Sequence, residues 1–221
     1  MAGRGLARLG GLCGFLFVIF MVPAYVVGYP DAPTPTSSAE EVISYFGASP
    51  GTFVLANGTL AVFSTFFFLW FLGALHGLLR RAEGEDVGLS SAALAGGVLF
   101  IALSCAGYAA EVIHPATQLR FEEFAPNAEP AFTSLALSAW LYHFCQVGAS
   151  VMICATSLIA LGSGALPRWL ALGGFVIALL TLLHVFLPLF AAISGLVWIA
   201  VFSALMLVGS GSASEPRRLA R

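Results

Sequence analysis

Charged residues are scarce in this sequence. Only 9% of its 221 residues are Asp, Glu, Lys or Arg, and 59% are hydrophobic, whereas soluble domains usually have about 25% charged residues. The mean hydropathy is +0.96. Such a chain cannot cover its surface with polar side chains, so the composition excludes an ordinary soluble domain and predicts a protein whose outer surface contacts membrane lipids.

Lysine is missing altogether, since all nine basic residues are arginines. Chemistry that needs a lysine amine, such as a retinal or pyridoxal-phosphate Schiff base, is therefore excluded. With many alanines and 24 glycines, this usage is typical of a GC-rich bacterial gene. The sequence also has neither a Walker A loop nor a G-x-G-x-x-G motif after a strand, and we expect no nucleic-acid partner.

Cysteine is rare and has no motif spacing. The four cysteines lie inside apolar runs, at Cys13, Cys105, Cys145 and Cys154. Without C-x-x-C spacing, we expect small buried hydrophobic side chains and no disulfide framework.

Long apolar runs dominate what remains. They cover residues 9–28, 53–79, 89–113, 132–161, 168–188 and 192–209, and about 20 apolar residues suffice for one helical crossing. The sequence therefore predicts an all-α polytopic membrane protein, a single transmembrane domain (1–221) that forms a six-helix bundle with external loops at 29–52 and 114–131. Because residues 183–195 carry no charge, five spans with one kinked, re-entrant segment is the alternative.

The arginines orient the predicted bundle. With six spans, only Arg120 falls on one side of the membrane, and the others share the opposite side: Arg4, Arg8, Arg80, Arg81, Arg168, Arg217, Arg218 and Arg221. Positively charged residues are enriched in cytoplasmic loops. We therefore expect both termini in the cytoplasm and a multi-pass protein of the bacterial inner membrane.

The first external loop contains a helix start signal. Ser38 is followed three residues later by Glu41, which matches a capping box and predicts a short helix through about Phe46. Val42, Tyr45 and Phe46 share one side of that helix. We expect it to rest on the membrane surface or to cap the bundle.

Polar side chains inside the spans follow helical spacing. Ser104, Tyr108 and Glu111 form one stripe, and His114 extends it. The other spans contribute Asn57, Ser64, Thr65, His143, Gln146, Ser150, Ser157, Thr181 and His184. Such groups are costly in hydrocarbon, so they should face the bundle interior. The glycines at 96–97, 162, 164 and 173–174 should serve as turn residues or allow close helix packing.

These residues define a candidate site in the outer half of the bundle. Its predicted ligand-binding residues are Asn57, Tyr108, Glu111, His114, His143, Gln146 and His184. We expect it to bind or pass a small ligand, a lipid or a proton.

Two other functions fit the same residues. A single Zn²⁺ or Fe²⁺ could bind Glu111, His114, His143 and His184, although the E-x-x-H pattern of di-metal bundles occurs once. His143 and His184 could instead be the axial ligands of a haem. Either would make the chain a metal- or haem-dependent membrane enzyme. Alternatively, the polar groups only fix packing in a structural subunit, with a second copy or another membrane subunit as partner.

The sequence also resembles known membrane proteins. It contains, in order, AEEVISYF, FFFLWFLGALHGLLRRAEGE, LSSAALAGGVLFIALSCAGYAAEV and LPRWLALGGFVIALLTLL. In these segments it is similar to a domain-of-unknown-function family of bacterial six-helix membrane proteins, common in actinobacteria. The resemblance implies a six-helix architecture and an inner-membrane location, and it implies no catalytic residues.

Overall fold

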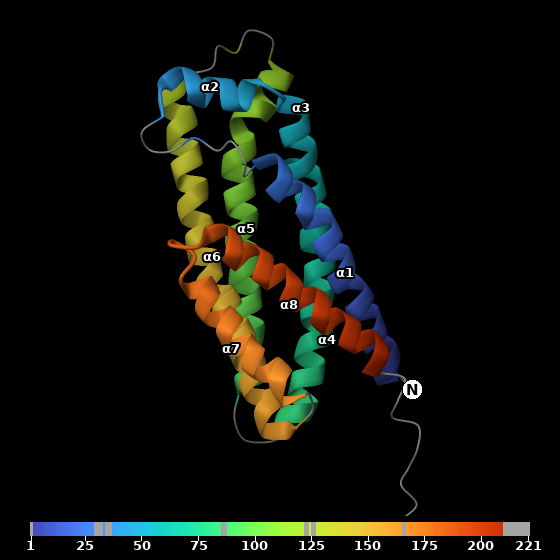
Figure 1. The fold of residues 1–221 in the computed structure, drawn as a ribbon. Coiled ribbons are helices and arrows are strands. Elements are labelled where there is room, and N and C mark those ends of the chain that lie inside the picture. The colour runs from blue at the N-terminus through green and yellow to red at the C-terminus, as the bar shows by residue number, and fades with distance from the viewer. Residues whose placement is uncertain are drawn as a thin grey trace, which may run out of the picture.

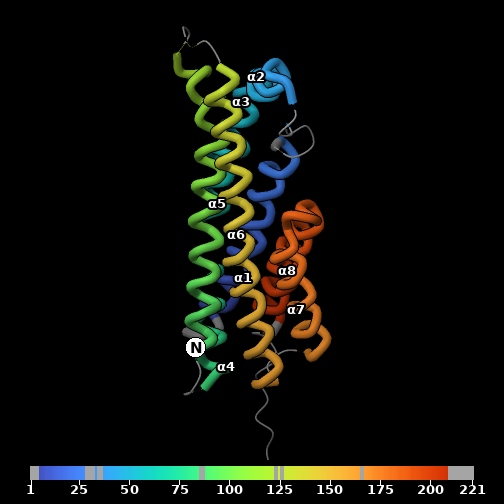
Figure 2. Tube along the Cα trace, turned by 90° about the vertical axis from the view of Figure 1, so that its left-hand side faces the viewer, coloured from blue at the N-terminus to red at the C-terminus, as the bar shows by residue number. Residues whose placement is uncertain are grey.

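A computed structural model describes residues 2–28, 33, 37–84, 88–121, 124, 127–164 and 167–209. These residues form helices and no strand. The helices are α1 (Ala2–Gly28), α2 (Ala39–Gly47), α3 (Pro50–Phe53), the π-helix η1 (Val54–Leu60), α4 (Ala61–Glu83), α5 (Leu89–Arg120), α6 (Ala128–Ser163), α7 (Arg168–Leu182) and α8 (Pro188–Gly209). The long helices form an elongated bundle (Figures 1 and 2).

Five helical segments are long and apolar enough to cross a membrane. They are Gly5–Val27, Pro50–Glu83, Leu89–Arg120, Ala128–Ser163 and Pro188–Val208. The second is continuous through α3, η1 and α4. These segments make the chain a helical membrane protein, as its composition predicts. The remaining helix, α7, has 15 residues and is therefore about 22 Å long, shorter than the ~30 Å hydrocarbon core.

The third span continues beyond its apolar run. α5 ends at Arg120, so His114 and Pro115 lie inside this helix. The predicted external loop 114–131 therefore begins only after Arg120, and α6 already starts at Ala128. The predicted third span, 89–113, was shorter than α5. The end of an apolar run marks where polar surroundings begin, but a helix can continue beyond that point.

The fifth predicted span, 168–188, also differs in the structure. α7 ends at Leu182, and α8 begins at Pro188, where a proline at the first helical position is favourable because its missing N–H would have no partner there. The turn between them lies about midway along the bundle (Figures 1 and 2). Thus α7 and α8 form a hairpin that extends along only part of the bundle.

The turn of this hairpin is suited to apolar surroundings. Its exposed side chains are Leu183, Val185, Phe186 and Leu187. Its backbone also bonds internally: the N–H groups of residues 183, 184, 186 and 187 donate to carbonyls at 179, 181, 183 and 183. Backbone groups in hydrocarbon must be satisfied within the protein. The choice between six spans and five spans with one kinked, re-entrant segment stays a prediction.

The backbones of α5 and α6 approach each other closely. A Cβ atom on Gly96 would lie 2.7 Å from the carbonyl oxygen of Gly148, and one on Gly148 would lie 2.6 Å from the carbonyl oxygen of Gly96. Both glycines are therefore required for the two backbones to approach each other, as predicted for Gly96. One turn further along α5, Phe100 packs against Phe68 of α4, with ring centroids 5.3 Å apart.

The capping box at Ser38 is confirmed. Glu41 N–H donates to Ser38 Oγ at 3.2 Å, and Ser38 N–H donates to Glu41 Oε2 at 2.8 Å. The resulting helix, α2, lies across one end of the bundle (Figure 1). Val42 and Phe46 are buried there and pack with Ala131 of α6. α2 is therefore a cap on the bundle.

The cysteines also agree with the prediction. None of the four forms a disulfide; Cys13 and Cys145 are buried, and Cys105 and Cys154 are half-buried. Cys13 packs in the apolar core, whereas Cys105 Sγ lies 3.0 Å from Thr65 Oγ1 and Cys145 Sγ donates to the Tyr142 carbonyl at 3.0 Å.

Candidate functional site

A cavity of about 400 Å³ lies between α1, α5, α6 and the α7–α8 turn. We call it the Glu111 cavity. It is lined by Ala24, Tyr25, Tyr108, Glu111, Leu135, Ser138, Ala139, Tyr142, Gln146, His184 and Pro188. Of the predicted site residues, it gathers Tyr108, Glu111, Gln146 and His184. Most of the other lining side chains are apolar or aromatic.

Glu111 supplies the carboxyl group of this cavity. It is 6% exposed, and its carboxylate accepts hydrogen bonds from two tyrosines. Tyr142 Oη of α6 donates to Oε2 at 3.0 Å, and Tyr45 Oη of α2 donates to Oε1 at 3.5 Å. No arginine in the described part of the chain pairs with this carboxylate. Two neutral donors therefore hold Glu111 without a positive partner.

The tyrosine rings form a wall beside Glu111. Tyr108 and Tyr142 meet edge to face, with ring centroids 5.1 Å apart and planes at 66°. Gly107 makes room for this pair, because a Cβ there would lie 2.9 Å from the Tyr142 ring. Tyr108 Oη donates to Met21 Sδ of α1 at 2.8 Å. The rings are therefore positioned by contacts from three helices.

His184 and His143 form a pair at another wall. Their ring centroids are 6.3 Å apart. His184 lines the Glu111 cavity, but His143 does not. His143 is half-buried and packs between Trp140 and Phe144, with centroid distances of 5.7 Å and 5.6 Å. The cavity therefore reaches only one of these rings. Binding of a haem between the two histidines stays a prediction.

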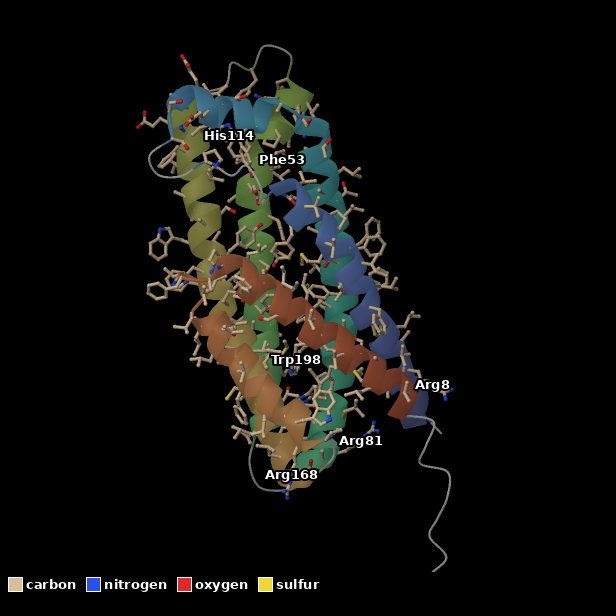
Figure 3. The ribbon with its side chains drawn as sticks, in the orientation of Figure 1. Arg8, Phe53, Arg81, His114, Arg168 and Trp198 are labelled. Atoms are coloured by element: carbon tan, nitrogen blue, oxygen red, sulfur yellow. The ribbon has the colours of Figure 1, made fainter. Side chains whose placement is uncertain are left out.

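His114 lies apart from the cavity, beneath the cap. Its ring is 5.8 Å from that of Phe46 in α2 and 6.1 Å from that of Phe124. Figure 3 shows it at the α2 end of the molecule, near Phe53. The side chain is buried, so the prediction that it faces the interior holds. The expectation that it joins Glu111 in one site does not fit this position, because its aromatic neighbours hold it among the capping residues.

The predicted metal ligands are thereby separated. Glu111 bonds to tyrosines, His143 pairs with His184, and His114 lies under α2. Over residues 2–28, 37–84, 88–121, 127–164 and 167–209, together with the isolated described positions, no three His, Cys, Asp or Glu side chains lie close enough to share a metal ion. Helical spacing places Glu111 and His114 on one face of α5, but His114 lies outside the Glu111 cavity. Of the other two histidines, only His184 lines that cavity.

Asn57 lines a different cavity. This second cavity, about 200 Å³, lies between η1, α4 and α5. Asn57 is 3% exposed, and neither its amide nitrogen nor its oxygen has a hydrogen-bond partner within the structure. Tyr108 lines both cavities and so stands between Asn57 and the Glu111 cavity. Asn57 is therefore not part of the site that contains Glu111.

The unpaired amide leads to a stability prediction. Asn57→Leu should raise the thermal unfolding midpoint of the detergent-solubilised protein, because burial of an amide without partners costs about 1–3 kcal/mol. Ser64→Ala is the control: Ser64 is also buried but donates to the Phe17 carbonyl at 3.2 Å, so its loss should lower the midpoint. A lower midpoint for Asn57→Leu would mean that the amide has a bonding partner.

Of the tyrosines around the Glu111 cavity, sequence reasoning found Tyr108 and missed Tyr25, Tyr45 and Tyr142. Tyr142 lies one position before His143, and Tyr45 was assigned only to the apolar side of α2. Tyr25 of α1 received no role. A signal did exist for Tyr142, since it lies four residues before Gln146 and therefore on the same side of α6.

Together, these features define an all-helical membrane protein with a partly polar cavity between its helices. No family model matches the sequence, and neither a curated protein nor a solved structure matches it.

Proposed function

We propose that this chain is a multi-pass membrane protein that binds a small molecule in the Glu111 cavity. The observation that carries the proposal is a buried carboxylate on the wall of a cavity of about 400 Å³. Small-molecule sites are generally clefts of ~300–1,000 Å³ with apolar walls and a few polar groups. Ionisable residues inside membrane spans are costly and usually functional.

The short hairpin supports this proposal. Because α7 and α8 turn back about midway along the bundle (Figure 1), they do not cover the part of α5 that carries Glu111. The turn instead contributes His184 and Pro188 to the cavity wall. A full-length pair of helices would pack against α5 and α6 in this region. The cavity therefore follows from the early end of α7 at Leu182.

We further propose that both termini lie in the cytoplasm of a bacterium and that the membrane is the inner one. Arg8, Arg81 and Arg168 lie together at the end opposite α2 (Figure 3), as expected for a cytoplasmic side. The tail arginines at 217, 218 and 221 are outside the described residues. In this topology the α7–α8 hairpin enters from the cytoplasm and returns to it.

A thiol-accessibility experiment tests whether the cavity is open to small molecules. Ser138 is 2% exposed and lines the cavity, whereas Thr156, also on α6, is 1% exposed and lines none of the cavities described above. In the purified full chain, N-ethylmaleimide should modify Ser138→Cys much faster than Thr156→Cys, with intact-mass spectrometry as the readout.

The same reaction with the unsubstituted protein gives the background modification of its four native cysteines. Equal, slow modification of the two introduced thiols would mean that protein atoms fill the space beside Ser138. That result would overturn the proposal of a ligand site.

A further inference from the structure

The charge of the cavity indicates the class of ligand. We propose that the Glu111 cavity binds an amphipathic organic cation, with an ammonium group held by the Glu111 carboxylate and the rings of Tyr25, Tyr108 and Tyr142. This inference rests on the proposed function, because it specifies what the same cavity binds.

The first argument is the missing countercharge. Of the acidic residues that the structure describes, Glu111 is the buried one. Its protein partners are two phenol O–H groups. A buried carboxylate without a positive partner carries a desolvation cost of several kcal/mol. The attraction of a cationic ligand offsets this cost, whereas a neutral ligand leaves the cost in place and an anionic ligand adds repulsion.

The second argument is the aromatic wall. Tyr25, Tyr108 and Tyr142 all line the cavity, and the last two rings are inclined at 66° to each other. Electron-rich ring faces attract cations, and cages of such rings recognise quaternary ammonium groups. The rings therefore attract the same charge as the carboxylate beside them.

The histidine wall is compatible with a cation. His184 lies beside His143, with ring centroids 6.3 Å apart. A neutral imidazole can accept a hydrogen bond from an ammonium N–H. This wall therefore does not require an anionic ligand.

The Glu111 cavity is too large and too apolar to suit a bare metal ion. Metal cations such as Ca²⁺ prefer six or more oxygen ligands, and this cavity has one carboxylate. Its volume of about 400 Å³ well exceeds the ~150 Å³ that suffices for benzene. Ala24, Leu135, Ala139 and Pro188 provide apolar surface for the remainder of the molecule. An ammonium group with an apolar substituent matches both parts of the cavity.

Two probes of the same shape separate charge from size. Benzyltrimethylammonium and its uncharged isostere neopentylbenzene would be titrated calorimetrically into the detergent-solubilised full chain. We expect the cation to bind more tightly than the isostere. Glu111→Gln should weaken cation binding by about thirtyfold or more, since removal of one partner of a buried charge pair has effects of that order, and should hardly change binding of the isostere.

Two variants make the result specific. Glu129→Gln removes a carboxylate that is exposed near the start of α6 and should leave both affinities unchanged. Tyr25→Leu keeps the charge of Glu111 but removes one ring, so it should weaken binding of the cation more than that of the isostere. This variant also tests the inference if Glu111→Gln fails to fold.

The outcomes distinguish the inference from the proposed function. Equal binding of both probes, unaffected by Glu111→Gln, would overturn the cation assignment and leave a small-molecule site. Absence of binding by both probes would also overturn the assignment. The reactivity of the Ser138→Cys thiol decides separately whether a ligand site exists at all.

Discussion

Replacing Gly148 by alanine should force α5 and α6 apart and destabilise the bundle by about 1–3 kcal/mol, the usual cost of overpacking. The upper part of this range is expected because the new Cβ would lie 2.6 Å from two backbone atoms, Gly96 O and Phe100 N. Backbone atoms cannot move aside as a flexible side chain can. The thermal unfolding midpoint of the purified protein in detergent measures the effect.

Gly162→Ala is the matched control. Gly162 lies in the same helix, α6, and a Cβ there would meet no atom within 4 Å. Since alanine favours helix over glycine by about 1 kcal/mol, this variant should be as stable as the unsubstituted protein or slightly more so. If the two alanine variants had the same midpoint, the inference that α5 and α6 approach too closely for a side chain at Gly148 would be wrong.

The second large effect is expected at the α7–α8 turn. Phe186 is 78% exposed and, in the proposed topology, contacts lipid near the middle of the membrane. Phe186→Lys should therefore reduce insertion and stability, because a charged side chain near the bilayer centre costs ~2.5–3.5 kcal/mol on insertion scales. The yield of folded protein from membranes and its unfolding midpoint in lipid nanodiscs measure this cost.

Phe121→Lys provides the comparison for this variant. Phe121 is 56% exposed and directly follows α5 at the capped end of the bundle, where a lysine can reach water. Its substitution should have little effect. Equal, small effects of the two substitutions would place the turn in water and argue for two complete spans.

The helices were largely predictable because each depends on a local pattern. Apolar runs located the long helices, and the Ser38–Glu41 pair located α2. Each of these signals consists of residues that are close together in the sequence. The end of α7 was harder, because residues 183–187 are as apolar as the helices on either side. Hydrophobicity indicates contact with lipid but does not indicate the depth at which a chain reverses direction.

The candidate site was predictable only in part. Helical spacing placed Tyr108 and Glu111 on one buried face of α5, as the structure has them. It could not show which side chains of α2 and α6 meet that face, because these partners are 66 and 31 residues away. For the same reason, helical spacing assigned His114 and Asn57 to the same site as Glu111. In the structure, His114 lies under the cap and Asn57 lies on the far side of Tyr108.

The two hydrogen bonds of Glu111 have a thermodynamic consequence for the cap. One carboxylate oxygen accepts from α6 and the other from Tyr45 of α2, so docking of α2 depends on the state of the same group that faces the cavity. Such linkage is reciprocal. Whatever free energy an occupant of the cavity adds to the docking of α2, the docked helix adds to the affinity for that occupant.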